Sequence, residues 1–100
     1  MNRDFYVQLT QEELRSPSFR SLEPVACALL IQLRALEART GSTLVSLSVR
    51  EARKHLNVSQ RPVERAFKAL EAHGWIEEAA AAPGRRRHYL LKSPSKASHG

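Results

Sequence analysis

Long polar side chains recur at helical spacing over residues 60–68, on the side of a predicted helix opposite to its apolar residues. The polar set is Gln60, Arg61, Glu64, Arg65 and Lys68. Guanidinium and amide groups form paired hydrogen bonds with base edges in the DNA major groove, and lysine contacts phosphate. The segment therefore predicts a recognition helix over residues 60–73 that could enter a major groove.

Each of these side chains has an expected role. Arg61 and Arg65 would contact guanine edges or phosphate, and Gln60 would contact adenine or phosphate. Lys68 lies later on the helix, so a phosphate contact is expected. Glu64 would either accept a hydrogen bond from a cytosine amine or hold Arg61 or Lys68 in place at helical spacing. The competing interpretation is a solvated helix face that recognises nothing.

A second basic cluster follows a turn signal. Pro83-Gly84 precedes Arg85, Arg86, Arg87 and His88, at the expected tip of a hairpin between two strands. Arginine inserted into a narrow minor groove, or placed on its flanking phosphates, is the mechanism that this pattern indicates for residues 83–88. The alternative is a basic loop that only adds solubility.

The helix pair that would position residues 60–73 has clear local signals. Ser48 and Glu51 match a capping box that begins a helix, on which Arg50 could contact phosphate. Asn57 suits a left-handed turn residue, and Ser59 is expected to cap the second helix. The pair therefore predicts a helix, a tight turn and a second helix. Arg53 and Lys54 on the first helix could also reach phosphate, although exposure to solvent is their default.

The remaining elements complete one small domain. Pro24 suits the first turn of a helix that runs to Ala38, and short strands are expected at 43–47, 75–78 and 87–92. The helix is apolar nearly all round, so burial on more than one side is expected. Its second apolar face consists of Cys27, Ile31, Ala35 and Ala38. That face would meet either the N-terminal segment or another subunit.

The two chain ends have different expectations. Residues 5–9 are rich in strand formers, and Thr10 with Glu13 predicts a short helix over 11–15. Phe19 and Leu22 are expected to anchor this region to the core. Residues 93–100 are rich in Ser and include Lys96, so a disordered basic tail is expected.

Composition limits the classes of function. The chain has 100 residues and a net charge of +6, which favours a polyanionic partner. Cys27 is the only cysteine, no apolar run approaches the roughly 20 residues of a membrane span, and no signal peptide is evident, so a cytoplasmic location is expected. Asp4 is the only aspartate, and the four histidines are scattered. No enzyme activity, metal, cofactor, membrane contact or small-molecule ligand is therefore expected. Arg20 and Arg34 give no reason to be singled out.

On these motifs the chain resembles winged helix-turn-helix proteins over about residues 5–92. The resemblance is sharpest at Leu47–Ala52, Leu56–Ser59 and Ala66–Ile76. Residues 14–22, followed by the Pro-led helix, look like the opening of small winged-helix proteins of phages, plasmids and integrated elements. Two positions depart from the pattern: Asn57 stands where glycine is usual, and Arg53 stands where a small alanine is common.

The resemblance implies an α+β fold, mostly α, with a three-helix core and a small three-stranded sheet bearing the wing. The expected divisions are an N-terminal extension over 1–22, the DNA-binding domain over 23–92 and the tail over 93–100. The expected contact set for double-stranded DNA is Ser59, Gln60, Arg61, Glu64, Arg65, Lys68, Arg85, Arg86, Arg87, His88 and Arg50.

The function expected from these features is that of a homodimeric transcriptional regulator, a repressor, since one recognition helix reads only a few base pairs. One alternative is a replication or partition protein of a plasmid or phage that binds repeated sites. The other is a winged-helix module that binds an acidic protein.

Overall fold

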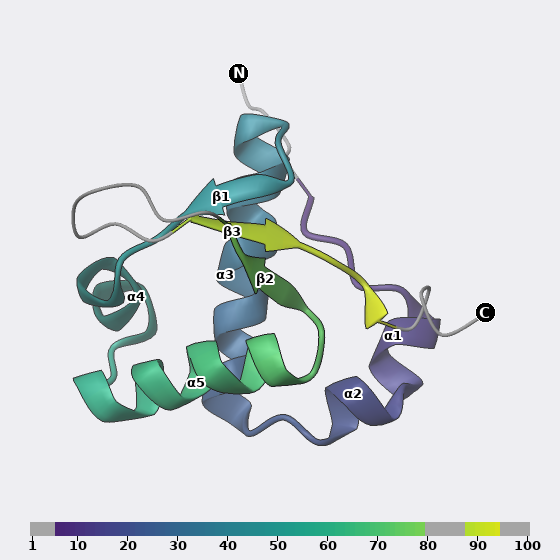
Figure 1. The fold of residues 1–100 in the computed structure, drawn as a ribbon, viewed down its shortest axis with the longest axis horizontal. Coiled ribbons are helices and arrows are strands. Elements are labelled where there is room, and N and C mark those ends of the chain that lie inside the picture. Colours follow the sequence, from purple (N-terminus) through teal and green to yellow (C-terminus); the bar gives the residue numbers. More distant parts are fainter. Residues whose placement is uncertain (1–5, 80–87, 95–100) are drawn as a thin grey trace.

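The computed structural model describes residues 6–79 and 88–94 of the chain. Along the chain the elements are α1 (Gln11–Arg15), α2 (Pro17–Arg20), α3 (Pro24–Thr40), β1 (Leu44–Ser46), α4 (Val49–Leu56), α5 (Gln60–Ala72), β2 (Ile76–Glu78) and β3 (His88–Leu91) (Figure 1). The predicted fold class, mostly helical α+β with a three-stranded antiparallel sheet, is confirmed.

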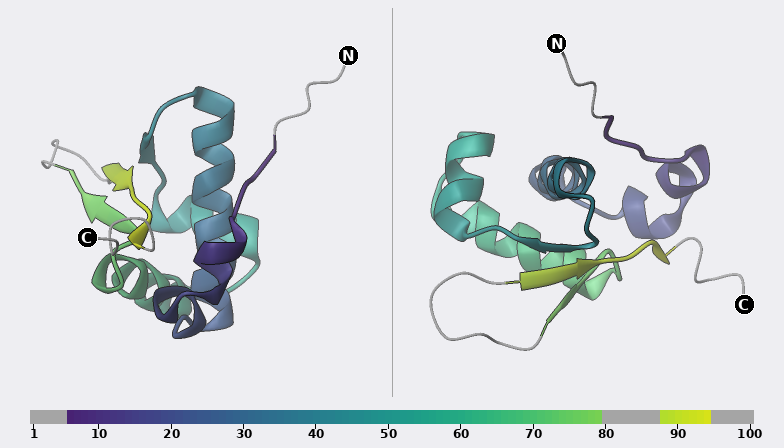
Figure 2. Two further views of the ribbon diagram at one scale, coloured as in Figure 1. Left: turned by 90° about the vertical axis from the view of Figure 1, so that its right-hand side faces the viewer. Right: turned by 90° about the horizontal axis from the view of Figure 1, so that it is seen from above.

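Helix α3 is the centre of the molecule. Seen nearly end-on in Figure 2, it has α4 on one side, α1 and α2 on the other, and the sheet across a third side. Leu29, Leu30 and Leu33 on this helix are fully buried, because neighbours surround it. The burial on more than one side that the apolar composition of this helix predicts is therefore confirmed. The helix continues two residues past Ala38, to Thr40, and its C-cap is Gly41, whose φ of 74° is the left-handed conformation that favours glycine.

The sheet has the order β1-β3-β2, so β3 is its central strand. Val45 pairs with Tyr89, and both are buried, whereas the adjacent pair Leu44 and Leu90 is exposed on the outer face. Strand β1 is one residue shorter than predicted at each end, β2 begins one residue later than predicted, and β3 ends one residue earlier. Arg87, expected to begin the last strand, lies outside the described residues. The sheet therefore contributes one apolar face to the core and leaves the other to solvent.

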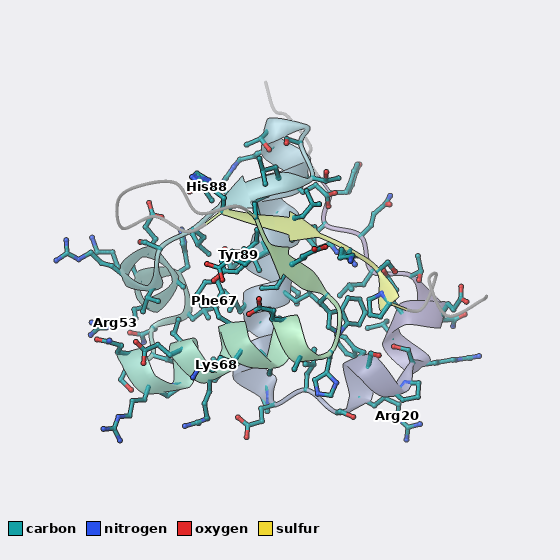
Figure 3. All side chains as sticks on the ribbon, in the orientation of Figure 1. Arg20, Arg53, Phe67, Lys68, His88 and Tyr89 are labelled. Atoms are coloured by element: carbon teal, nitrogen blue, oxygen red, sulfur yellow. The ribbon has the colours of Figure 1, made fainter. Side chains whose placement is uncertain are left out.

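An aromatic stack joins the sheet to α5. Phe67 of α5 and Tyr89 of β3 are buried, with ring centroids 5.2 Å apart and planes inclined by 18° (Figure 3). Offset stacking of this kind adds roughly 0.5–1.5 kcal/mol beyond area burial. The contact sets the position of α5 relative to the strands that carry the hairpin.

The turn between α4 and α5 forms largely as predicted. Ser48 and Glu51 make both hydrogen bonds of a capping box, and Asn57 adopts φ 57° and ψ 48°. Ser59 is the N-cap residue of α5, but its side chain makes no capping hydrogen bond, contrary to expectation. Pro62 at the third helical position contributes to this, since proline lacks one of the two N–H groups that usually donate to an N-cap oxygen.

The left-handed conformation of Asn57 leads to a stability prediction. Replacing Asn57 with valine is expected to lower the free energy of unfolding by about 1–2 kcal/mol, because a β-branched side chain crowds the backbone at positive φ. Replacing it with glycine is expected to leave the stability equal or higher. Urea denaturation of the three proteins measures both effects. A valine variant as stable as the parent would contradict the backbone assignment.

The N-terminal extension departs from expectation in one element. Residues 6–10 form no strand, because they run beside α3 rather than along a sheet edge, and the Gln8 carbonyl accepts a hydrogen bond from Arg34 at 2.8 Å. Phe5 lies outside the described residues. The predicted short helix is confirmed, since Thr10 and Glu13 form a complete capping box at the start of α1.

The two predicted anchors of the extension are confirmed. Leu22 is part of the buried core, and Phe19 meets the edge of the Trp75 ring at a centroid distance of 6.1 Å. The second apolar face of α3 is covered only in part, because Cys27 packs against the core whereas Ile31 remains 40% exposed. The extension is therefore packed onto the domain rather than attached by a linker.

The chain remains packed beyond residue 92, where a disordered tail was expected to begin. The Ser93 hydroxyl donates a hydrogen bond to Glu13 at 2.5 Å. Pro94 lies against Gly74, where a Cβ atom added to the glycine would come within 3.4 Å of its ring. Residues 95–100 of the expected tail lie outside the described part of the chain.

Candidate nucleic-acid interface

The polar side chains predicted for recognition share one face of α5. Val63, Ala66, Phe67 and Leu70 of this helix are buried against α3 and the sheet. The opposite face is exposed to solvent and carries Gln60, Arg61, Glu64, Arg65 and Lys68. Ser59 is also exposed, at the N-cap. The apolar spacing in the sequence therefore assigned the two sides of the helix correctly.

Two of the three cations on this face are unpaired among the described residues, namely Arg61 and Lys68. Arg65 has a partner, because its Nε lies 3.7 Å from a carboxylate oxygen of Glu23. The two side chains are 64% and 68% exposed, so water and salt screen this contact. A phosphate or base could replace Glu23 at little cost in stability.

Glu64 pairs with no cation among residues 6–79 and 88–94. Its Oε2 accepts a hydrogen bond from Gln60 Nε2 at 2.8 Å, one helical turn earlier. One of the two expectations for Glu64, a structural pairing with Arg61 or Lys68, is therefore wrong. Both pairings were sterically possible at helical spacing, so the sequence could not discriminate between them and the Gln60 partner.

Helix α4 adds further cations beside the start of α5. Arg50, Arg53 and Lys54 are exposed, and Figure 3 shows Arg53 directed outward from α4. Ala52 on the same helix is completely buried. The arginine at position 53 is thus accommodated with its head in water, and the small side chain is found one position earlier.

The charge of the α4–α5 unit is positive on balance. Residues 49–72 contain six basic and three acidic side chains: Arg50, Arg53, Lys54, Arg61, Arg65 and Lys68 against Glu51, Glu64 and Glu71. Two cations elsewhere are neutralised within the fold, since Arg34 pairs with Glu13 at 2.8 Å and Lys92 pairs with Glu77 at 3.0 Å. The α4–α5 unit therefore offers a cluster of cations that an external anion can reach.

The predicted wing is only partly described. Arg85, Arg86 and Arg87 lie outside the described residues, whereas the strand ends that flank residues 80–87 are joined by a hydrogen bond from Ala79 N to His88 O at 2.9 Å. His88 begins β3 opposite Ser46 and is half-buried. In Figure 3 the Tyr89–Phe67 stack separates His88 from Lys68. The structure therefore does not bring His88 to the exposed face of α5.

Sequence reasoning missed the ion pair between Glu13 and Arg34. Arg34 donates to both carboxylate oxygens of Glu13, at 3.1 and 2.8 Å, and its guanidinium lies 5.7 Å from the centroid of the Trp75 ring. Only 6% of the Glu13 side chain and 12% of the Arg34 side chain are exposed. The capping-box pattern located Glu13, but no local signal links it to a residue 21 positions away.

The surroundings of Glu13 change its pKa. Burial raises the pKa of this carboxyl, but hydrogen bonds from Arg34, Ser93 and the Thr10 backbone, together with the charge of Arg34, outweigh burial and lower the pKa from 4.5 to about 2. Glu13 is therefore ionised at neutral pH. It joins the N-terminal extension, α3 and the segment after β3 in one network, remote from α4.

Residues 6–79 and 88–94 contain neither a membrane-spanning helix nor a cluster of metal-binding side chains. Within these ranges, no helix has the length and apolar character that a bilayer crossing requires. The same residues contain no cluster of three or more His, Cys, Asp or Glu side chains that could bind a metal ion.

Comparison with known proteins gives a likeness in fold. No protein-family model matches the chain, and no curated protein sequence matches it. A solved structure described as the N-terminal domain of a DNA binding protein superposes with a TM-score of 0.66 at 14% sequence identity, over 94% of this chain and 86% of that chain. Because the superposition covers nearly the whole chain, the extension and the helix–sheet core together are similar to a known arrangement.

Proposed function

We propose that this protein is a winged helix-turn-helix protein that binds double-stranded DNA as a sequence-specific transcriptional regulator. The observation that carries the proposal is the exposed face of α5. This face carries cations and an amide, whereas the other side of the helix is apolar and buried, and three more cations lie nearby on α4. The similar solved structure supports the same class, since it is described as a domain of a DNA binding protein.

In the proposed complex α5 lies in the major groove. Arg61 and Arg65 contact guanine edges, Gln60 and Glu64 also contact base edges, and Lys68 and Arg50 contact phosphates. Residues 83–88, with the three arginines and His88, form the wing on the minor groove or its phosphates. Residues 23–92 constitute the DNA-binding domain, with 1–22 as an extension packed on it. The protein acts in the cytoplasm as a repressor. It binds as a homodimer, because one recognition helix covers only a few base pairs.

The dependence of affinity on salt provides a quantitative prediction. If about six phosphates are contacted, the logarithm of the association constant should fall with the logarithm of salt concentration with a slope of roughly −5. Fluorescence anisotropy of a labelled duplex over a range of about 50–200 mM salt measures this slope. A slope near zero would contradict binding through phosphates.

Selection of sites from a random duplex library tests the proposal directly. Enrichment of an inverted repeat is the expected result and would establish sequence-specific binding by a dimer. Enrichment of tandem direct repeats would favour a replication or partition protein instead. Absence of any enriched sequence would overturn the assignment of α5 as a recognition helix.

A further inference from the structure

We infer that Gln60 and Glu64 act as one reading unit, which selects the exocyclic amine of adenine or cytosine at one position of the major groove. The inference rests on the proposed function, because it assigns a chemical preference to part of the same α5 surface. Its basis is the hydrogen bond of 2.8 Å between Gln60 Nε2 and Glu64 Oε2.

The direction of this hydrogen bond is set by chemistry. An ionised carboxylate only accepts hydrogen bonds, so the amide nitrogen of Gln60 must face Glu64. The Gln60 carbonyl oxygen is consequently turned away from the carboxylate. An isolated glutamine could present either its donor or its acceptor to a base, whereas this one is biased toward a single orientation. Exclusion of solvent from the groove strengthens that bias, because a hydrogen bond is electrostatically stronger away from water.

The groups left available on the pair are mainly acceptors. They are the Gln60 carbonyl oxygen, the second oxygen of Glu64 and one remaining N–H of the amide. Among the described residues no cation pairs with Glu64, and no other side chain bonds either member. The pair therefore presents a net negative, hydrogen-bond-accepting surface within an otherwise basic face.

Such a surface matches only part of the major-groove pattern. The exocyclic amines are N4 of cytosine and N6 of adenine, and both donate hydrogen bonds there. Guanine presents the acceptors O6 and N7 at the same depth, so a carboxylate opposite guanine would be left desolvated without a donor. Adenine would use the amide of Gln60 in two hydrogen bonds, with Glu64 orienting it. Cytosine would donate directly to Glu64.

The test is site selection with the wild-type protein and the variants Glu64→Gln, Gln60→Ala and Glu71→Gln. Glu71 is exposed on the same helix two turns later, so its substitution matches the charge change of Glu64→Gln without touching the pair. The expected result is that Glu64→Gln and Gln60→Ala lose roughly 10-fold or more of their preference at the same base position, while Glu71→Gln keeps it. Unchanged preferences at the other positions of the site show that each variant still binds as a folded protein.

The outcomes separate the inference from the proposed function. Loss of an adenine identifies reading through the Gln60 amide, and loss of a cytosine identifies direct reading by Glu64. If Glu64→Gln selects the same sequence as the wild type, or if the two variants affect different positions, the reading unit is overturned although DNA binding stands. If the wild type enriches no sequence, both the unit and the proposed function are overturned.

Discussion

Replacing Arg61 and Arg65 together with alanine is expected to weaken binding to the selected duplex by roughly 100-fold. Each side chain can supply a paired hydrogen bond to a base that is worth about 1–3 kcal/mol, and about 1.4 kcal/mol corresponds to a tenfold change in affinity. Arg61 has no partner among the described residues, and Arg65 only exchanges an exposed contact with Glu23. Neither arginine has to break a strong internal ion pair in order to bind DNA, so the loss of affinity in the variant should reflect the lost DNA contacts. Titration by fluorescence anisotropy at fixed salt measures it.

Two control variants make this experiment specific. Arg39→Ala removes an exposed arginine near the C-terminal end of α3, which Figure 1 shows at the opposite end of that helix from α5, and its affinity should change little. Arg61→Lys keeps the charge but loses the planar fork, so base preference should relax while the salt slope stays the same. Equal loss of affinity in Arg39→Ala would mean that only overall charge matters, and the recognition assignment would fail.

Replacing Glu13 with glutamine is expected to lower the free energy of unfolding by about 3 kcal/mol at pH 7. Removing one member of a buried ion pair leaves the other charged and partly desolvated, which costs roughly 3–5 kcal/mol. Here Arg34 would lose the carboxylate charge and one of its two hydrogen bonds to position 13, because a glutamine amide has a single acceptor oxygen; its hydrogen bond to the Gln8 carbonyl and its contact with the Trp75 ring would remain. Urea denaturation of the variant and the parent gives the difference. A change below about 0.5 kcal/mol, the usual range for a surface substitution, would show that the pair contributes nothing net.

The same carboxyl gives a stability that depends on pH. The pKa of Glu13 is lowered from 4.5 to about 2 in the folded protein, and each unit corresponds to about 1.4 kcal/mol. Because the folded pKa lies below the unfolded one, the contribution is complete above about pH 5 and is lost as the pH falls toward about 2. The parent should therefore lose about 3 kcal/mol more than Glu13→Gln over this interval.

An exposed ion pair in the same molecule serves as the matched control. Lys92 and Glu77 lie 3.0 Å apart, but their side chains are 51% and 61% exposed. Substituting Glu77 with glutamine should change the stability by less than about 1 kcal/mol, because solvent screens the pair. If Glu77→Gln and Glu13→Gln proved equally costly, burial would not be the reason for the effect at Glu13.

Much of the α4–turn–α5 unit could be predicted from local sequence. The Ser48–Glu51 capping box, the left-handed Asn57 and the buried face of α5 all agree with prediction. Each depends on residues within about four positions of one another, so propensity and periodicity are sufficient. The sequence also contained a signal against the side-chain cap at Ser59, since Pro62 cannot donate one of the two usual capping hydrogen bonds.

The failures have a different origin. Residues 6–10 have strand-forming side chains but lie along α3, because no sheet edge is adjacent to them. Nothing in the sequence singled out Arg34, yet it binds Glu13 and the Gln8 carbonyl beneath the extension. Propensity describes what a segment prefers in isolation, whereas these outcomes depend on which distant segment becomes its neighbour.

The sequence alone was enough to assign the buried and exposed faces of α5, because a helix repeats its faces about every 3.6 residues wherever it is placed. The same periodicity showed which long polar side chains reach solvent together. Only the arrangement in three dimensions decided the partners of the charges: Glu13 with Arg34 and Ser93, and Arg65 with Glu23 where α5 crosses the start of α3. The partners in each of these contacts are far apart along the chain, so no helical or strand periodicity relates them. Electrostatic energy depends on distance and burial, and both arise only when the chain has packed.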